Sequence, residues 1–268
     1  MSFWGHAFTF NGIPCEDYDL MLYNIGNNTH SAGKFASGMT IVEDKPASAW
    51  KPIFYGAKWD KKLEFDIVFG VNPARADAHK HLDRYELEAI AMWLTGHSQY
   101  MWLEIEQEDM EYVRYRCIIS ELEMIEYGNM PWALKAHVTC DSPYAYLYPQ
   151  TYRFTVSGSQ NVTLFNESGH NGYYMPKLAI AFTGSTGTVS IVNKTDNNRA
   201  FTLTDVPRGE GTVRVDNDTK VITSDAGGNI YSYFNFQFLR LLRGVNELTI
   251  TGNCTVEIIC EFPVNMGG

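Results

Sequence analysis

Long apolar runs are missing from this chain of 268 residues. No stretch approaches the roughly 18 apolar residues that a membrane helix needs, so we expect no membrane insertion. The first residues, MSFWGHAFTFNG, lack both the basic region and the apolar region of a secretory signal peptide. We therefore expect the protein to fold in a reducing cytoplasm.

Cysteine is scarce and forms no recognisable pairing pattern. The five cysteines are an odd number, and none belongs to a CxxC motif, so the sequence predicts neither a disulfide framework nor a thiolate metal site. Cys254 and Cys260 share one face of an alternating segment. At about 3.3 Å of rise per residue they lie roughly 20 Å apart, too far for a mutual disulfide, and we expect both to be buried as small apolar residues.

Basic residues are also too few for a nucleic-acid face. The chain carries 21 Lys and Arg against 31 Asp and Glu, a formal net charge of −10. Proteins that read DNA or RNA present a basic surface to the phosphates. We therefore expect no sequence-specific binding of nucleic acid.

Catalytic motifs are absent as well, since the chain has no HExxH, GxSxG or Walker pattern. Glu104, Glu106 and Glu108 alternate along one expected strand, where they could bind calcium or act as paired carboxylates of a glycoside hydrolase. The same pattern describes the solvated face of a strand. We favour the solvated face and predict no catalytic residues and no enzymatic activity.

Two further patterns resemble metal sites without completing one. His79 and His81 are two apart, a spacing that does not bring side chains together on a helix. Asp216 and Asp218 resemble the start of an EF-hand loop, but Lys220 occupies a ligand position. We predict no metal site and no cofactor.

The tryptophans divide the chain into two halves. All six precede residue 140, and a segment with two prolines, CDSPYAYLYP, follows directly. A change of composition at a proline-containing stretch indicates a domain boundary. We place an N-terminal domain at residues 1–142 and a C-terminal domain at residues 143–268.

The first half predicts β-strands and a single helix. Strands are expected where apolar and polar residues alternate, and a helix over about 77–95 is expected from apolar residues at helical spacing, capped by Asp77 and ended by Gly96. Residues 24–38 are rich in Gly, Asn and Ser and predict a mobile loop or hairpin tip. The strand segments are 7–10, 20–25, 39–42, 63–69, 100–105, 112–119 and 132–140.

The second half shows many short alternating segments separated by turn signals, which predicts a β-sandwich. The overall fold class is therefore mainly β, a β-rich α+β chain. Within YSYFNFQF (231–238), Tyr231 and Tyr233 are our candidate partner-contact residues, because exposed aromatic rings supply large contact area. The alternative is that they belong to the core of one more strand.

Four segments resemble the distal tail proteins of siphophages, in the order found in that family. FTFNGIPCEDYDLML (8–22) resembles the family's opening, and AIAMWLTG with YMWLEIE resembles its helix and strand pair. ALKAHVTCDSPYAY resembles the crossing between its two domains. FQFLRLLRGVNELTITGNCTVEI resembles its closing hairpin.

This resemblance implies a structural virion protein. It implies an N-terminal β domain with one helix and an extended hairpin that assembles as a homohexameric ring, and a galectin-like C-terminal β-sandwich at the periphery. The expected partners are other copies of the chain, the tail tube protein, a tail-associated or tip protein, and a receptor-binding protein. The expected location is the virion tail tip, after assembly in the bacterial host cytoplasm.

A second hypothesis is a carbohydrate-binding protein that recognises host cell-wall glycans through the C-terminal sandwich, with tyrosines as stacking platforms. Galectin-type sites resemble one another in a Trp and a His-Asn-Arg cluster. The second half has no Trp, and its His170-Asn171 pair is followed by Gly172. The resemblance therefore stops short of a galectin-type sugar site.

Overall fold

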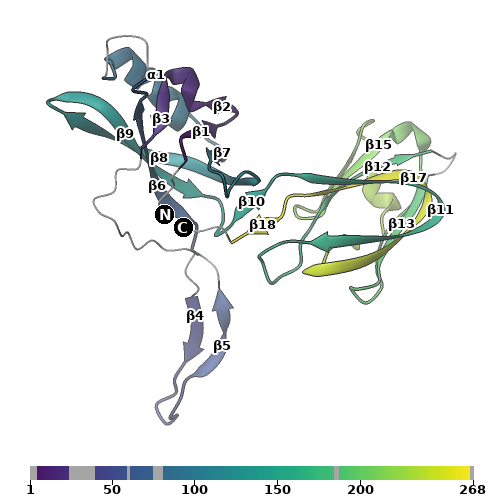
Figure 1. The fold of residues 1–268 in the computed structure, drawn as a ribbon. Coiled ribbons are helices and arrows are strands. Elements are labelled where there is room, and N and C mark those ends of the chain that lie inside the picture. The colour runs from purple at the N-terminus through teal and green to yellow at the C-terminus, as the bar shows by residue number, and fades with distance from the viewer. Residues whose placement is uncertain (1–4, 24–39, 59–60, 75–80, 184–186, 266–268) are drawn as a thin grey trace. The chain divides into compact units, whose positions relative to one another are not determined.

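The computed structural model describes residues 5–23, 40–58, 61–74, 81–183 and 187–265. The chain forms two compact units, both seen in Figure 1. The first runs to Tyr146 and includes Asn265, and the second runs from Leu147 to Val264. Among the described residues, α1 (Arg84–Thr95) is the one α-helix, and antiparallel strands make up most of both units. The predicted fold class, mainly β with one helix, is confirmed.

One curled antiparallel sheet organises the first unit. Its strands follow the order β2, β1, β7, β8, β9, β6, β3. The curl brings the two ends together, because the Leu22 N–H of β3 donates to the carbonyl of His6, next to β1, at 2.9 Å. The strands are β1 (Ala7–Phe10), β2 (Ile13–Pro14), β3 (Leu20–Leu22), β6 (Glu64–Val71), β7 (Met101–Glu106), β8 (Val113–Tyr127) and β9 (Met130–Cys140).

The alternation in β6 shows why this sheet has a buried and an exposed face. Phe65, Ile67 and Phe69 are buried, whereas Glu64 and Asp66 between them are exposed. Successive side chains of a strand point to opposite faces, so the sequence pattern alone separates core from solvent.

Helix α1 begins later than the sequence pattern predicts. Its first residue is Arg84, and the N-cap is Asp83, whose carboxylate accepts hydrogen bonds from the N–H groups of Tyr85 and Glu86 at 2.8 Å. Glu86 accepts the N–H of Asp83 in return, which completes a capping box. Residues 81–83, which the prediction includes in the helix, are not helical, so the predicted helix start is wrong there. Asp77, the predicted cap, lies outside the described residues.

Trp93 fixes the helix against the sheet. Its ring stacks on Tyr18 with 4.6 Å between centroids, and on Phe8 with 5.7 Å. Its indole N–H donates to the carbonyl of Phe10 at 3.2 Å. The helix therefore covers the part of the core formed by β1 and by the 3₁₀-helix η1 (Cys15–Tyr18).

Strands β4 (Thr40–Asp44) and β5 (Ile53–Lys58) form a separate two-stranded antiparallel hairpin. Figure 1 shows this hairpin as a ribbon of its own. No ladder joins it to another strand in the described parts of the chain. Residues 24–38, where we expect a loop, lie outside the described residues.

The second unit contains seven strands in the order β14, β13, β17, β12, β15, β16, with β11 also paired to β17. The strands are β11 (Gln150–Asn166), β12 (Lys177–Phe182), β13 (Gly187–Asn193), β14 (Arg199–Val206), β15 (Thr212–Asp216), β16 (Val221–Ser224) and β17 (Gly244–Cys260), and the short helical elements are η2 (Arg208–Glu210) and η3 (Ile230–Tyr233). Two further short strands, β10 (Ala145–Leu147) and β18 (Pro263–Val264), lie where the chain passes from one unit to the other and are not part of this sheet.

Strand β17 converts this sheet into a sandwich. One edge of β17 pairs with β11 along its whole length, while the other edge pairs first with β13 and, from Cys254 onward, with β12. The change falls at Gly252, where φ is +145° and an added Cβ would lie 2.5 Å from the carbonyl oxygen of Thr188. Side chains of both halves, such as Ile191 and Ile180, share one buried cluster, so the halves face each other.

All five cysteines are buried. Cys254 and Cys260 lie on the core face of β17, as predicted. Burial raises the pKa of the Cys254 thiol to about 11 and that of Cys260 to about 12. Both are therefore protonated at neutral pH and fill the core without thiolate chemistry.

Candidate interaction surfaces

The β4–β5 hairpin presents large apolar side chains to solvent. Trp50 is 86% exposed, Phe54 and Tyr55 are 64% exposed each, and Ile41 is 58% exposed. Every residue of β4 and β5 is exposed or half-buried, so neither face of the hairpin lies against a core. Exposed apolar residues gathered on one element are typical of a surface that another molecule covers.

A second exposed apolar group lies at the tip of the β8–β9 hairpin. Gly128 and Asn129 both have positive φ, at 61° and 63°, which is typical of the tight turns that match the twist of a hairpin. Around this turn Met124, Tyr127 and Met130 are all more than half exposed. The first unit therefore has two apolar hairpins available for contacts.

Charged residues link three strands on the outer face of the same sheet. Asp66 of β6 lies opposite His137 of β9, with 2.8 Å between Oδ1 and Nδ1. Lys135 Nζ lies 3.3 Å from Asp66 and 3.2 Å from Glu123 of β8. Partial burial opposes ionisation of Asp66, but the hydrogen bonds from His137 and Lys135 outweigh it and hold the pKa of Asp66 below its usual value.

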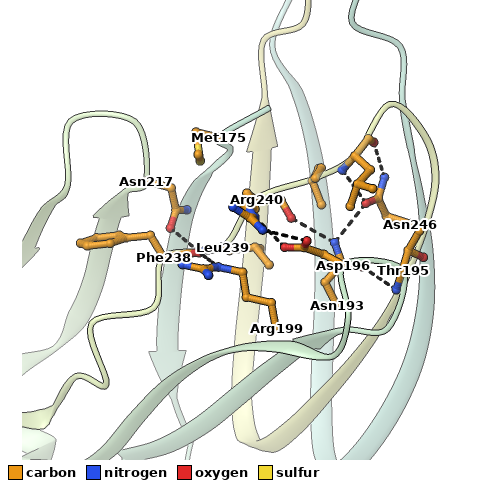
Figure 2. A network of polar contacts seen from close by, with 12 residues as sticks. Met175, Asn193, Thr195, Asp196, Arg199, Asn217, Phe238, Leu239, Arg240 and Asn246 are labelled. Carbon is orange, nitrogen blue, oxygen red and sulfur yellow. Dashed lines mark hydrogen bonds and ion pairs between the residues drawn. The ribbon is translucent and has the colours of Figure 1, made fainter. Parts of the chain in front are cut away.

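A buried polar network occupies one end of the second unit (Figure 2). Asn193, at the end of β13, and Asn246, on β17, have no exposed surface. The Asn193 amide donates to Asn246 Oδ1 and to the Arg240 carbonyl, both at 3.0 Å. Asn246 in turn accepts the N–H of Leu242 at 2.9 Å. The segment between η3 and β17 has almost no strand pairing of its own, and these buried side-chain amides hold its backbone in place.

Asp196 and Arg240 form the charged part of this network. Arg240 donates to both carboxylate oxygens, with Nε to Oδ2 at 2.6 Å and Nη2 to Oδ1 at 3.0 Å. The guanidinium also lies 3.7 Å from the centroid of the Tyr173 ring. The Asp196 side chain is only 2% exposed, so every polar atom of its carboxylate is used inside the protein. This geometry indicates a structural role.

The candidate aromatics lie in a 3₁₀-helix, so the strand alternative is wrong. Both Tyr231 and Tyr233 are half-buried and pack against the sandwich core. The Tyr231 hydroxyl accepts the N–H of Ile222 at 3.0 Å and donates to the carbonyl of Lys220 at 2.9 Å. That hydroxyl is therefore engaged within the unit, and a partner contact at either ring stays a prediction.

A shallow depression of about 510 Å³ lies on the outer face of β11, β12, β15, β16 and β17. Ala179 and Ala181 of β12 are among its lining residues, together with three basic residues, Arg153, Lys177 and Arg214. Arg153 lies 3.5 Å from Glu257, and Arg214 contacts Asp225. The sequence could not reveal this hollow, because it depends on how strands from residue 150 to residue 260 are ordered side by side in the sheet.

The structure does not bring together the carboxylates whose sequence pattern suggested a calcium site or a catalytic pair. Glu104 and Glu106 lie on β7, but Glu108 follows the strand in a turn. Asp216 accepts the N–H groups of Asp218 and Thr219, at 2.9 Å and 3.0 Å, and so stabilises the turn after β15.

The two histidines that resemble a metal site are not both placed by the structure. His81 precedes the helix, and His79 lies outside the described residues. Among the residues described, no group of three or more His, Cys, Asp or Glu side chains could hold a metal ion. No helix in the same part of the chain is both long and apolar enough to cross a membrane.

Comparison with known proteins identifies the class. Residues 3–142 match a family model described as a phage tail protein N-terminal domain, and residues 144–260 match one described as a phage tail C-terminal domain. The chain therefore belongs to this family of phage tail proteins. Among curated protein sequences, none is detectably similar to it.

Solved structures show the same fold at low sequence identity. The crystal structure of phage SPP1 Dit (gp 19.1), titled a paradigm of the hub adsorption apparatus in phages that infect Gram-positive bacteria, matches with a TM-score of 0.67 and 14% identity over 96% of this chain and 98% of that one. Two structures of the phage P2 baseplate in its activated conformation also contain a matching chain. In the structure with Ca the TM-score is 0.52, at 9% identity over 95% of this chain and 97% of that one. In the structure with Sr the TM-score is 0.51, at 10% identity over 96% of this chain and 97% of that one. The resemblance to distal tail proteins is confirmed.

Proposed function

We propose that this phage tail protein is a distal tail hub, which forms a homohexameric ring between the tail tube and the tail-tip and host-adhesion proteins. Residues 1–142 build the ring, and residues 143–268 form a peripheral domain that docks tip or receptor-binding components. Assembly takes place in the bacterial cytoplasm. The exposed apolar β4–β5 hairpin is the observation that carries this proposal.

The physical argument starts from the instability of such a hairpin alone. A two-stranded hairpin without a sheet or helix beneath it is marginally stable in water. Trp50, Phe54 and Tyr55 would each bury a large apolar area against a neighbour, and aromatic residues are enriched at the centres of such interfaces. A hairpin that inserts into the next copy is a head-to-tail contact, the kind that closes into a ring.

Native mass spectrometry of the purified protein at several concentrations tests the ring. We expect a dominant species at six times the chain mass of 30.4 kDa. Replacing Trp50, Phe54 and Tyr55 together by Ser removes the apolar contact and is expected to leave the single chain. The matched control replaces Phe236 and Val245 of the second unit by Ser. These residues are 68% and 53% exposed, and the control is expected to keep the hexamer. A monomer at every concentration of the unmodified protein would contradict the ring.

The depression on the sandwich supports a second function, the recognition of host cell-wall glycans. Its lining offers threonine hydroxyls and paired charges, groups that hydrogen-bond to sugars. Tyr231 and Tyr233 do not line it. Binding of the full-length protein to purified host cell walls, weakened by Lys177→Ala but not by Arg208→Ala, would support this function. Equal binding by both variants would count against this depression as the site.

A further inference from the structure

The sandwich of the second unit has three outer strand edges, formed by β14, β16 and β11. An open edge presents unpaired N–H and C=O groups and is a template for another strand, so proteins usually cover it. In the part of the chain that the structure describes, two of the three edges are covered by hydrogen bonds from another segment and one is not, and this difference indicates a docking surface.

Asn235 covers the edge of β14. Its N–H donates to the carbonyl of Thr202 at 3.2 Å, and its side-chain oxygen accepts the N–H of Thr202 at the same distance. Its side-chain amide donates to the carbonyl of Ala200 at 2.8 Å. An isolated bridge between Leu203 and Phe234 continues this cover. The β14 edge is therefore closed by a segment of its own chain.

Tyr231 covers the edge of β16 from the same loop. As described above, its hydroxyl bonds to the N–H of Ile222 and to the carbonyl of Lys220, on either side of Val221. One surface segment, residues 229–238, thus closes both edges. This also gives Tyr231 a structural role.

Among the described residues, nothing covers the edge of β11 in this way. All of its ladder partners, from Gln150 to Asn166, lie on β17, and no other strand in the described part of the chain pairs with it. The strand contains no Pro and only one charged residue, Arg153, although both are common devices against edge pairing. Gly158, with φ of +88°, interrupts the regular strand backbone at the midpoint of β11 and divides the edge into two stretches of equal length.

The side chains along this edge define what would fit. Tyr152, Phe154 and Val162 alternate with polar residues and pack only partly against the core. A strand added beside them, with apolar residues at every second position, would complete their burial. Each stretch accommodates a segment of about eight residues, within the usual range of strand lengths.

We propose that the open edge of β11 binds an extended, largely uncharged segment of another tail protein, with apolar side chains at alternate positions, as an added β-strand. This inference rests on the proposed ring in one respect. Pairing β11 with a second copy of itself requires a two-fold axis, and a six-fold ring contains none that relates neighbouring chains in this way. A segment from a different protein has no such restriction.

Hydrogen exchange of the backbone amides tests the proposal. We would compare three samples, namely the free protein when dilute, the free protein when concentrated, and intact virions. We expect amides of β11 to exchange at least ~100-fold more slowly in virions than in either free sample, because added ladder bonds suppress local opening. Amides of β14 and β16, which are already covered, serve as internal controls and should not change.

Two outcomes would overturn the inference. Slow exchange of β11 that appears in the concentrated free protein identifies a second copy as the occupant. Equal exchange of β11 in all three samples shows that the edge stays open. Neither outcome depends on the mass measurement that tests the ring, so the two proposals fail separately.

A substitution on β11 tests whether the open edge is needed for infection. Val162→Lys places a charge on the core side of the edge, which opposes strand addition. The purified variant is expected to keep its oligomeric mass and its circular dichroism, while phage carrying it lose infectious titre at least ~100-fold. Thr204→Lys, at an exposed position of the covered β14 edge, is the control and is expected to keep the titre. Folded Val162→Lys protein with unchanged titre and unchanged exchange in virions would contradict the added strand.

Discussion

Asp196 shows how one side chain can hold a long loop in place. Its carboxylate is almost fully buried and accepts two hydrogen bonds from Arg240, whose guanidinium also stacks on Tyr173. Such a bidentate pair is stronger than a neutral hydrogen bond and fixes geometry in two directions. Removing one partner leaves the other charge without compensation in a largely buried place.

We therefore expect Asp196→Asn to lower the free energy of unfolding by about 3 kcal/mol, the usual cost of breaking a buried ion pair. Urea unfolding followed by circular dichroism measures this. The matched control is Glu257→Gln, because Glu257 pairs with an Arg153 side chain that is 69% exposed. Exposed pairs contribute about 1 kcal/mol or less, so losses of equal size in both variants would contradict the structural role of Asp196.

At the scale of elements, β17 depends on one glycine. Gly252 lies where the strand changes its partner from β13 to β12, in a backbone conformation that L side chains rarely adopt. The carbonyl of Thr188 occupies the space where a Cβ would stand. The two layers of the sandwich can therefore share this strand only if the residue at the bend has no side chain.

Gly252→Ala is expected to destabilise the protein by about 2 kcal/mol or more, through backbone strain and the clash with Thr188. Gly209→Ala is the control, because nothing lies within 4 Å of its added Cβ and its φ is not positive. The control should change the free energy of unfolding by less than about 1 kcal/mol in either direction. Thermal unfolding of both variants measures the two stability changes. Equal changes in the two variants would contradict the role of Gly252.

The three-strand charge group on the first sheet predicts a dependence on pH. The folded pKa of Asp66 lies below its unfolded value of about 3.8, so its contribution to stability is present above that value and is lost as the pH falls through the folded pKa. The drop in melting temperature between about pH 6 and about pH 3 should be smaller in Asp66→Asn than in the unmodified protein. An identical drop in both would show that Asp66 does not contribute.

Local patterns predicted most elements, and long-range contacts account for what they missed. The alternation of Leu63 to Phe69 identified β6, because one face of that strand is core. The helix start was missed although the signal, Asp83 followed by Glu86, was present, because Asp77 is also a plausible cap. The alternating aromatics after Asn229 look like a strand, yet Phe236 has φ of +59°, which no regular strand contains. The depression and the closed edges arise from strand order, which periodicity does not encode.

At the scale of the whole molecule, the second unit has the features of an independent domain. It has its own buried cluster, and the Leu147 N–H donates to the Phe262 carbonyl at 2.9 Å, so its two ends lie side by side. The fragment Leu147–Val264 is therefore expected to fold alone, with one cooperative thermal transition by circular dichroism. Lack of a cooperative transition would contradict its independence. Asp196→Asn should lower the melting temperature of this fragment as it does that of the full chain.

The adjacent ends of the second unit have a consequence for the evolution of the phage. A coding segment that enters and leaves at neighbouring points can be exchanged for another, or enlarged, without altering the path of the chain in the first unit. Recombination at the two ends of this segment would thus give a phage a different C-terminal domain while the first unit of the protein stays the same.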